Sequence, residues 1–520
     1  MTDFSNRLPR KLYRAEQVRK LDQIAIEEFA ISGLTLMRTA GAVAFNALME
    51  RWPQTRHLQI FTGSGNNAGD GYIVAGLACE QGISAEIVFL ADPEKLQGDA
   101  LEAYQWANQF KLKLTDFADF DSSSETGHAY PVIVDSLFGT GLDREVQGDY
   151  KLAIDYINSC RLPVLAIDIP SGLSADTGQS LGATVLADLT VTFIGMKQGL
   201  LTNQGRDFIG EILYHDLDVP DAVFTVDSAP QPSAVRIDIN YASKFLLPRE
   251  KSSHKGSHGH VLVIGGDSGF GGAAIMAAEA AQRTGAGLVS VVTRSAHRPA
   301  FLARAPEIMV AGTEDEGLDI GSLLDKANVI VIGPGLGRGV WSQKLMQHAL
   351  AAQISNNIPL VIDADALHLL AERLQQGSNI KRDNWILTPH PGEAAALLNC
   401  STEDIQQDRF EAVSKLNSIW GGACLLKGSG SLICTLEDEQ QKLYLSSEGN
   451  AGMASGGMGD VLSGIVGSLV AQGLSLQQSL CCGVCIHGEA ADLSMEAGGQ
   501  RGMAATDLLP FIRQLVNPHR

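Results

Sequence analysis

Residues 57–90 read HLQIFTGSGNNAGDGYIVAGLACEQGISAEIVFL, in which two apolar runs flank a helical one. The first run, HLQIF, leads into a glycine-rich segment at Gly63–Gly71, which the helical YIVAGLACEQG follows. The second apolar run is AEIVFL at 85–90. Strand, loop, helix and strand in this order predict a βαβ unit of a parallel sheet.

The same alternation continues on both sides of this unit. A helix-like segment at 15–30 precedes it, and apolar runs that end in loops follow at 131–139 and 163–172. A second block has such runs at 260–269, 288–293, 328–337, 358–367, 385–393 and 423–431, then a long glycine-rich loop and a helix at 460–473. The two blocks share no fixed-period repeat, and we therefore interpret them as different domains.

The chain has 520 residues, which is too long for one hydrophobic core. Around 218–236, prolines and small polar residues replace the helical period, as is typical of a junction between domains. We expect an α/β protein of two domains: a Rossmann-like doubly wound sheet over 1–225, a linker over 226–238, and a second α/β domain over 239–520.

Charge and composition exclude several classes of partner. The net charge is −20 with no stripe of Lys and Arg, so a nucleic-acid partner is not expected. The N-terminus lacks the apolar stretch of a signal peptide, and no run reaches the ~18–20 apolar residues of a membrane span. Eight sparse cysteines are typical of the reducing cytoplasm, where we expect the protein to act without a membrane partner.

One group of cysteines invites a different interpretation. Cys481, Cys482 and Cys485 lie close to His487, a combination that suits metal or redox chemistry. The surrounding SLCCGVCIHGEAA is rich in small residues and has no second cysteine pair. We expect a buried helix, because a free cysteine packs like a small hydrophobic side chain.

The N-terminal block carries polar residues where three strands end. The segment Gly63–Gly71 is suited to binding phosphate through its amides, although it is neither a Walker A loop nor a clean GxGxxG. Asn67, Asp135 and Ser171 offer hard oxygen ligands for a simple cation, and Asp168 offers a carboxylate for proton transfer. The alternatives are a tight turn for the glycines and helix or turn caps for the acids.

The most specific pattern is GMASGGMGDVL at 452–462. Its glycines direct amides at an anion, and Asp460 stands beside them at the start of a helix. Phosphoryl transfer to a hydroxyl needs both, because donors stabilise the transferring group and a base accepts the alcohol proton. The alternative is that Asp460 is a plain helix N-cap.

Other strand ends of this block are less specific. The segment Lys427–Ser431 is a second phosphate-compatible turn, and two prolines fix the loop that presents His390 and Glu393. A lone histidine is more often a surface or hydrogen-bonded residue than a ligand. Asp363 and Asp365 are either linked to a metal or caps of the next helix, and the sequence does not separate these roles.

Over roughly residues 10–220, the motifs GSGNNAGDGY, VDSLFGTGL and IDIPSG resemble the NAD(P)H-hydrate epimerase domain. The resemblance implies that potassium binds at Asn67, Asp135 and Ser171. Asp168 is our candidate for the acid/base, whose identity the sequence does not settle. The resemblance also implies that the hydrated dinucleotide is held by Asn66, Asn67, Ala68, Gly69, Asp70, Gly139, Thr140, Gly141, Leu142, Asp143, Arg144, Glu145 and Asp168.

Over roughly 240–515, the segments above and the HKGSHGHVLVIGGDSGFGG stretch resemble the ADP/ATP-dependent NAD(P)H-hydrate dehydratase, a ribokinase-like family. This resemblance implies a ribokinase-like fold that uses ADP or ATP with Mg2+. The hydrate-binding positions would be Ala273, Gly337, His390 and Asp460. The nucleotide-binding positions would be Lys427, Gly428, Ser429, Gly430, Ser431 and Gly459.

Together the resemblances imply an enzyme that epimerises hydrated NADH or NADPH and dehydrates one epimer, and relatives assemble as homo-oligomers. Asp460 would accept the proton of the hydrate hydroxyl while that group is phosphorylated. Two alternatives remain: a kinase for a small vitamin-type alcohol with an N-terminal ligand-binding regulatory module, and an N-terminal domain that binds without catalysis. The sequence does not distinguish ADP from ATP, or NADH hydrate from NADPH hydrate.

Overall fold

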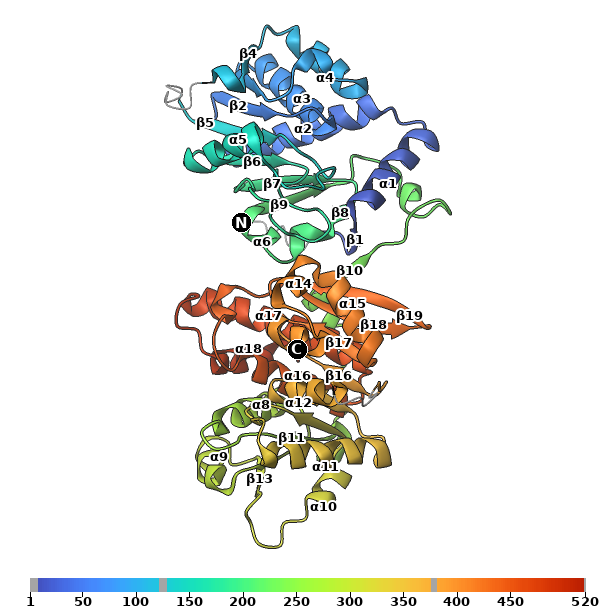
Figure 1. Cartoon of the computed structure of the whole chain (residues 1–520), viewed down its shortest axis with the longest axis vertical. Helices are drawn as coiled ribbons and strands as arrows, with labels where there is room; N and C mark the ends of the chain where they lie inside the picture. The colour runs from blue at the N-terminus through green and yellow to red at the C-terminus, as the bar shows by residue number, and fades with distance from the viewer. Residues whose placement is uncertain (1–7, 121–128, 376–380, 519–520) are drawn as a thin grey trace. The chain divides into compact units, whose positions relative to one another are not determined.

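The computed structural model describes residues 8–120, 129–375 and 381–518 (Figure 1). The chain divides into two compact units, Met1–Val235 and Arg236–Arg520. Each unit has its own sheet, which confirms the expected α/β class.

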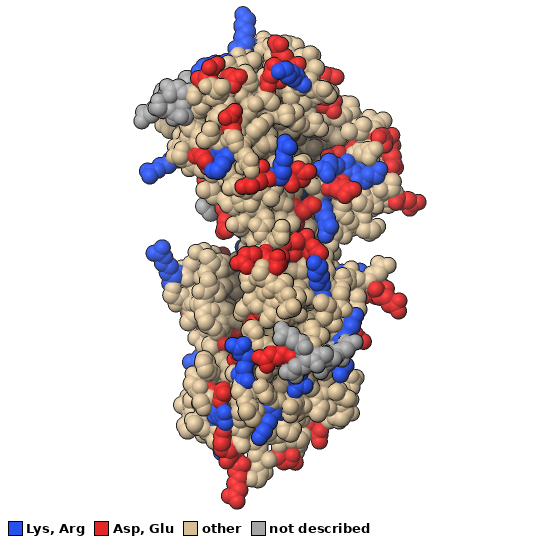
Figure 2. All heavy atoms as spheres, viewed as in Figure 1, with Lys and Arg blue, Asp and Glu red and all other residues tan. Residues whose placement is uncertain are grey.

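On the face shown in Figure 2, basic side chains are scattered among acidic ones.

The N-terminal unit is built on a seven-stranded sheet of order β4-β3-β2-β5-β6-β7-β9, in which every pair is parallel. The chain first moves outward through β3 and β4, then returns to β5 and continues in the opposite direction. This reversal between β2 and β5 is the switch point of a doubly wound sheet. The strands are β2 (His57–Thr62), β3 (Ser84–Phe89), β4 (Lys113–Asp116), β5 (Pro131–Ser136), β6 (Val164–Ile167), β7 (Leu189–Phe193) and β9 (Glu211–His215). A short ribbon adds β1 (Lys11–Tyr13), β8 (Met196–Lys197) and the start of β10 (Ala234–Ile237).

Helices cover both faces of this sheet. Residues Leu58 and Ile60 of β2 pack into the core formed with the helices on one face, whereas Phe61 packs on the α5 side. Alternate residues of a strand face opposite ways, so this division shows a three-layer unit. The helices are α1 (Ala15–Glu27), α2 (Gly33–Arg51), α3 (Asn66–Glu80), α4 (Gly98–Asn108), α5 (Gly148–Ser159) and α6 (Gly205–Phe208).

The helix after β2 begins earlier than the sequence suggested. We expected a loop at Gly63–Gly71, but α3 begins at Asn66, so Asn66–Gly71 form its first turns. The chain therefore turns within Gly63–Gly65. The first amides of α3 lack partners within the helix and remain available to a ligand.

The C-terminal unit has the strand order β13-β12-β11-β14-β15-β16-β17-β18-β19. The strands from β13 to β17 are parallel, and the chain reverses between β11 and β14. They are β11 (His260–Ile264), β12 (Leu288–Thr293), β13 (Met309–Gly312), β14 (Val329–Ile332), β15 (Leu360–Ile362), β16 (Trp385–Leu387), β17 (Ala423–Leu426), β18 (Ser431–Glu437) and β19 (Gln440–Ser446).

Our expectation of one long loop after β17 was wrong. The hairpin β18–β19 pairs antiparallel with β17 and occupies most of this segment. Its turn residues Asp438 and Glu439 have positive φ, which lets the two strands reverse tightly. The glycine-rich approach to α16 is confined to the residues after Ser446.

The site-bearing helix α16 (Met458–Ala471) packs against α8 (Gly271–Thr284) and against β11, β14 and β15. The cysteine group lies in α17 (Leu476–Gly498), where all three thiols are buried, which confirms the packing interpretation. The other helices are α7 (Ile239–Ala242), α9 (Arg298–Arg304), α10 (Ile320–Asp325), α11 (Val340–Asn356), α12 (Asp365–Gln375), α13 (Pro391–Leu398), α14 (Thr402–Gln407), α15 (Arg409–Trp420) and α18 (Leu508–Leu515). In the described part of the chain, no helix is long and apolar enough to cross a membrane.

Candidate active sites

The N-terminal unit has a cavity of about 840 Å³ at the carboxyl ends of β2, β5 and β6. It lies at the switch point of the sheet, where doubly wound folds bind ligands. The predicted residues that line it are Asn66, Asn67, Asp70, Gly139, Thr140, Gly141, Leu142, Asp143, Arg144, Glu145 and Asp168. Ala68 and Gly69 are buried in the first turn of α3. Gly139 lies against both motifs, because a Cβ there would be in ordinary contact with Cβ of Asn67 at 3.4 Å and with Oδ2 of Asp168 at 3.6 Å.

The three residues predicted to hold a cation form one buried cluster. The Ser171 hydroxyl donates to Oδ1 of Asp135 at 2.6 Å, and the Ser171 amide donates to Oδ2 at 2.7 Å. Asn67 donates through Nδ2 to the Phe138 carbonyl at 2.9 Å, while its buried Oδ1 has no hydrogen-bond partner among the described residues. Burial raises the pKa of Asp135 to about 6. An acceptor left alone beside a buried carboxylate fits a bound cation better than it fits a hydrogen-bonded turn.

Asp168 follows β6 in the left-handed region, with φ of 69°, and it does not cap a helix. Its carboxylate pairs with the ammonium of Lys197 on β8. Lys197 is 1% exposed and also donates to the Thr192 hydroxyl at 3.0 Å and the Phe193 carbonyl at 2.9 Å. The arrangement holds Asp168 at the cavity wall as an ion pair.

Two more carboxyl groups line this cavity, on α1 and α3. Burial and the neighbouring Asp168 raise the pKa of Asp22 to about 6, although Lys197 opposes the shift. For Asp70, burial followed by Asp168 and Asp22 raises the pKa well above the usual range. Three carboxyls therefore share one ammonium, so at least one of them binds a proton near neutral pH.

In the C-terminal unit, Asp460 is the third residue of α16. The residue before the helix, Gly457, has φ of 93°, and a Cβ there would lie 2.6 Å from the Met276 side chain. Because Gly457 occupies the N-cap position, the N-cap interpretation of Asp460 is wrong. The carboxyl of Asp460 is instead free to act on a ligand at the helix N-terminus.

The strands β15 and β17 deliver a buried ion pair beside this helix. Lys427 donates to Oδ1 of Asp363 at 2.7 Å, and the Ser463 hydroxyl donates to Oδ2 of Asp363 at 2.6 Å. Asp363 is only 2% exposed at its side chain. A Cβ at Gly459 would lie 3.3 Å from Nζ of Lys427 and 3.6 Å from Oδ2 of Asp363, so glycine leaves the ion pair open to α16.

Asp460 faces a mixed electrostatic environment. Burial is the largest cause that raises its pKa to about 7, and repulsion from Asp363, Asp365 and Glu393 adds to it. Lys427 opposes the shift. A carboxyl that titrates near neutral pH is suited to accept a proton in catalysis.

His390 and Glu393 begin α13 and form a reciprocal cap. Nδ1 of His390 accepts the amides of Gly392 at 3.0 Å and Glu393 at 3.3 Å, so the ring proton lies on Nε2. Nε2 faces Oε1 of Glu393 at 3.3 Å, and the other oxygen of Glu393 lies 3.7 Å from Lys427. The histidine ring is 54% exposed. His390 thus stabilises the helix start and also presents one edge to a ligand.

The loop after β14 completes this edge of the sheet. The Gly337 amide donates to Oδ2 of Asp365 at 2.8 Å, and a Cβ at Gly335 would lie 3.1 Å from Cβ of Ala273. The loop that carries Gly337 therefore packs through Gly335 on Ala273 of α8. Lys427, Gly337, His390 and Asp460 come from the ends of neighbouring strands and from α16, as expected for a site at the carboxyl edge.

Comparisons with known proteins give the family. Residues 261–514 match the family model described as NAD(P)H-hydrate dehydratase, and residues 33–199 match the one described as YjeF-related protein N-terminus. The chain is 44% identical over 518 residues to the bifunctional NAD(P)H-hydrate repair enzyme Nnr of Coxiella burnetii, covering 98% of this chain and 99% of the relative. The enzyme of the same description from Escherichia coli is 39% identical, with 98% and 95% covered. The chain belongs to the bifunctional NAD(P)H-hydrate repair enzymes.

Several solved structures each match about half of the chain. A ribokinase-like superfamily protein from Enterococcus faecalis is 28% identical, covers 54% of this chain and 95% of its own, and has a TM-score of 0.49. The ADP/ATP-dependent NAD(P)H-hydrate dehydratase from Bacillus subtilis, co-crystallised with ATP/Mg2+, is 24% identical, with 53% and 95% covered and a TM-score of 0.45. The predicted family and enzyme class are confirmed by the full-length relatives.

Three residues of this repair enzyme escaped the sequence analysis. Lys197 and Asp22 lie outside the glycine motifs, and only the fold brings them to Asp168. Arg409 is 1% exposed and donates to the carbonyls of Leu426, Lys427 and Gly430 at 3.3–3.4 Å, so it fixes the Lys427–Ser431 turn. Burial lowers the pKa of Arg409 to about 10. No local sequence pattern indicates that a distant buried arginine donates hydrogen bonds to the carbonyls of this turn.

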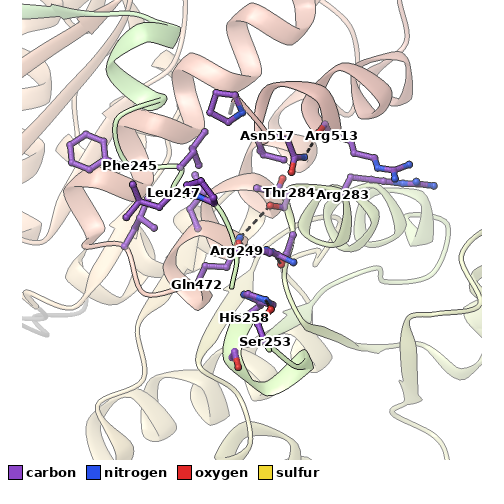
Figure 3. A pocket seen from close by; sticks show the side chains of 18 of the residues that line it. Phe245, Leu247, Arg249, Ser253, His258, Arg283, Thr284, Gln472, Arg513 and Asn517 are labelled. Carbon is purple, nitrogen blue, oxygen red and sulfur yellow. Dashed lines mark hydrogen bonds between the residues drawn. The ribbon is translucent and has the colours of Figure 1, made fainter. Parts of the chain in front are cut away.

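Two other features lie apart from these sites. A cavity of about 860 Å³ lies near Arg249, Gly285 and Gln472 (Figure 3). Gly285 and Gln472 follow the C-terminal ends of α8 and α16, opposite the end of α16 that carries Asp460. We assign it no role in the repair chemistry.

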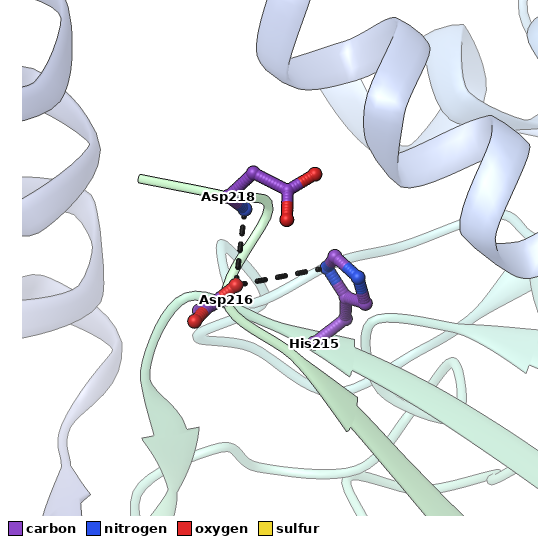
Figure 4. A group of neighbouring side chains, drawn as sticks. All are labelled: His215, Asp216 and Asp218. Atoms are coloured by element: carbon purple, nitrogen blue, oxygen red, sulfur yellow. Dashed lines mark hydrogen bonds and ion pairs between the residues drawn. The ribbon is translucent and has the colours of Figure 1, made fainter. Parts of the chain in front are cut away.

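A second group consists of His215, Asp216 and Asp218, whose ligand atoms lie within 4.8 Å of one another (Figure 4). Nδ1 of His215 accepts the Leu217 amide at 3.0 Å, and Oδ1 of Asp216 accepts the Asp218 amide at 3.0 Å. These bonds form a turn after β9. The group is explained by that turn without a metal.

Proposed function

We propose that the chain repairs NADH and NADPH whose nicotinamide ring has taken up water. The C-terminal unit removes the water at the expense of ADP or ATP, and the N-terminal unit interconverts the R and S epimers so that the S form is always supplied. The observation that carries the proposal is the cluster of Asp460, Gly459, Lys427 and Asp363 at the end of the sheet, in a chain of this family. In this proposal, residues 1–225 form the epimerase and residues 239–520 form the dehydratase.

Dehydration needs a better leaving group than hydroxide. Asp460 accepts the proton of the ring hydroxyl, whose oxygen then takes the phosphoryl group of the nucleotide. The amides at Gly457–Gly459 stabilise the charge on that group, and the ammonium of Lys427, which lies next to Gly459, neutralises phosphate oxygens. Phosphate then leaves the ring carbon, the neighbouring carbon loses a proton, and the double bond returns.

The nucleotide and magnesium fit the residues present. In the turn Lys427–Ser431, Gly428 and Gly430 have positive φ. Because neither glycine has a side chain, a phosphate can approach the backbone amides of this turn closely. Magnesium supplies charge neutralisation to the nucleotide phosphates. Carboxylates near Lys427, among them Glu393 with one oxygen 3.7 Å from its ammonium, would supply oxygen ligands for such an ion.

Potassium is the cation we propose for Asn67, Asp135 and Ser171. The free Oδ1 of Asn67 and the buried carboxylate of Asp135 form a donor set of hard oxygens. Bound there, such a cation would supply a fixed positive charge next to the cavity. We further propose that the protein acts in the cytoplasm, because its eight cysteines are free thiols. We also propose that it assembles as a homo-oligomer, as the resemblance implies.

The test is recovery of reduced nicotinamide. The purified chain is incubated with S-hydrate, magnesium and ADP or ATP, and absorbance of the dihydronicotinamide is followed. Recovery in proportion to AMP or ADP released supports the proposal. A stable phosphorylated vitamin-type alcohol without any recovery would instead identify a small-molecule kinase. Addition of R-hydrate alone tests the epimerase, because recovery then requires conversion to S.

The pH dependence of dehydration should show one limb set by Asp460. The base must be ionised, and its pKa is raised to about 7, so kcat/KM rises with pH through about 7 and levels off above it. Below pH 7, the expected fall is about tenfold for each pH unit. The measurement is the initial rate on S-hydrate at low substrate from pH 5.5 to 9. A flat profile across pH 6–8 would contradict this assignment.

Potassium should stabilise the N-terminal unit. A site filled at about one hundred times its dissociation constant adds about 2.7 kcal/mol to the free energy of unfolding. We expect KCl to raise the unfolding temperature of that unit over lithium chloride at equal ionic strength, and the Asn67→Ala variant to lose the difference. Dehydration of S-hydrate in the same samples is the control. An equal response of wild type and variant would refute the site.

A further inference from the structure

Epimerisation at the hydrated carbon sets a chemical requirement. Hydration of a dihydronicotinamide places the hydroxyl on the carbon next to the ring nitrogen, because the enamine takes its proton at the other carbon. To invert that carbon, the C–O bond breaks as the nitrogen lone pair forms a C=N bond. The oxygen must receive a proton to leave as water. A water that adds from the other face must lose one, so the site needs a donor and an acceptor.

Lys197 cannot be the donor. An ammonium has three N–H groups, and those of Lys197 point to Asp168, to the Thr192 hydroxyl and to the Phe193 carbonyl. The side chain is 1% exposed, and although it borders the cavity, all three of its N–H groups are already engaged by the protein. Its role is to hold the Asp168 carboxylate in place by an ion pair. Asp168, which is 17% exposed at the cavity wall, is therefore the acceptor.

Asp22 is the carboxyl placed to be the donor. It extends from α1 into the same cavity as Asp168. In the described part of the chain no hydrogen bond or ion pair engages its oxygens, so its proton is free to move to a ligand. Burial and repulsion from Asp168 raise its pKa to about 6, which keeps a share of it protonated near neutral pH. Residues 33–199 match the N-terminal family model, and Asp22 precedes that range.

Asp70 is the third carboxyl of the cavity and is the natural competitor. It lies on α3, and burial with repulsion from Asp168 and Asp22 raises its pKa well above the usual range. Asp70 stands in the first turns of α3 beside Asn66 and Asn67, the segment that we assign to binding the hydrate, whereas Asp22 reaches the cavity from α1. We therefore assign Asp70 to substrate binding and Asp22 to proton donation.

We propose that Asp22 and Asp168 are the acid and base of the epimerase and that Lys197 positions Asp168. This inference rests on the proposed epimerase function of the N-terminal unit. The Asp22 carboxyl gives its proton to the ring hydroxyl, the C–O bond breaks, and water leaves while C=N forms. Water then attacks the opposite face and gives its proton to Asp168. The net transfer of one proton from Asp22 to Asp168 is reversed through solvent before the next turnover.

The charged groups that line the cavity with Asp22 come from every surrounding element. They are Arg19 on α1, Asp70 on α3, Asp99 on α4, Asp143, Arg144 and Glu145 after β5, Asp168 after β6 and Lys197 on β8. Because the donor must be protonated, the epimerase rate should fall as pH rises above about 6. The Asp22→Asn variant should lose this alkaline limb.

The experiment follows exchange between purified R- and S-hydrate by proton NMR in the full-length chain without nucleotide. We expect Asp22→Asn to lower kcat by a factor of about 10² or more with KM within threefold, since that is the usual contribution of a general acid. Asp22→Glu should restore part of the rate. The matched control is Asp155→Asn, an exposed carboxyl on α5 outside the cavity, which should leave the exchange unchanged. Dehydration of S-hydrate by the same samples shows that the chain is folded.

The outcomes separate the two claims. If wild type exchanges the epimers and Asp22→Asn keeps more than a third of its rate with the same pH profile, Asp22 is not the donor. A rise in KM without a fall in kcat would also overturn the assignment, because it would make Asp22 a binding residue. If wild type itself exchanges no epimers, the proposed epimerase function fails instead. For Lys197, the Lys197→Arg variant keeps a positive charge beside Asp168 and should retain a higher kcat for exchange than Lys197→Met, with KM unchanged in both.

Discussion

Replacing Asp460 with asparagine is expected to lower the rate of nucleotide-dependent dehydration by a factor of about 10²–10⁴, the usual contribution of a general base. The amide has nearly the shape of the carboxyl but cannot accept the hydroxyl proton. In the described structure no side-chain hydrogen bond holds the Asp460 carboxyl, so the change removes chemistry rather than a structural contact. The measurement is a single-turnover rate of NADH recovery from S-hydrate with saturating ADP and magnesium.

The matched control is Asp438→Asn. Asp438 lies in the turn between β18 and β19 with φ of 48°, a conformation that asparagine adopts readily. That variant should dehydrate at the wild-type rate. Epimer exchange should be unaffected in both variants, because the N-terminal unit has its own cavity. A dehydration rate for Asp460→Asn within threefold of wild type would exclude Asp460 as the base.

Replacing Lys427 with methionine is expected to destabilise the C-terminal unit by about 3–5 kcal/mol, the cost of leaving one member of a buried ion pair alone. Asp363 would keep the hydroxyls of Ser463 and Thr388 as neutral partners but would lose its counter-charge, and repulsion from Glu393 and Asp460 would no longer be offset. The measurement is unfolding in urea, with the transitions of the two units followed separately because a single two-state value does not apply.

Two further variants make the Lys427 result specific. Lys415→Met removes a lysine that is 60% exposed and paired with Glu411 on the surface of α15, and it should change stability by less than about 1 kcal/mol. In the double variant Lys427→Met with Asp363→Asn, the buried charge is gone, so part of the lost stability should return. Additive losses in the double variant would show that the ion pair does not carry the effect.

Much of the architecture follows from the sequence because strand ends in a parallel sheet meet at one edge. The apolar runs before Asp135, Asp168 and His390 are strands, and the glycine motifs after them lie where a doubly wound sheet binds ligands. Gly63–Gly71 was predicted as a loop, yet its last six residues are helical. The reason is that glycine and asparagine are common both in loops and in the first turn of a helix, so a local sequence pattern does not distinguish the two.

What the sequence does not show is which distant charges share a cavity. Lys197 reads as part of an unremarkable Met-Lys-Gln-Gly segment, and Asp22 as one polar residue of an amphipathic helix. Their proximity to Asp168 depends on the path of β8 and on how α1 packs over the sheet. Arg409 is similarly invisible, because a buried guanidinium that bonds only carbonyls follows from tertiary packing and from no spacing rule.

Gly457 has a consequence for the divergence of this family. Its φ of 93° strains any residue with a side chain, and such a residue would also press on Met276. A descendant with another amino acid at this position would keep every strand of the sheet while α16 no longer starts with open amides. Loss of this glycine therefore predicts loss of phosphoryl transfer. Related chains that keep the fold but have another residue at this position are expected to bind ligands without catalysing the reaction.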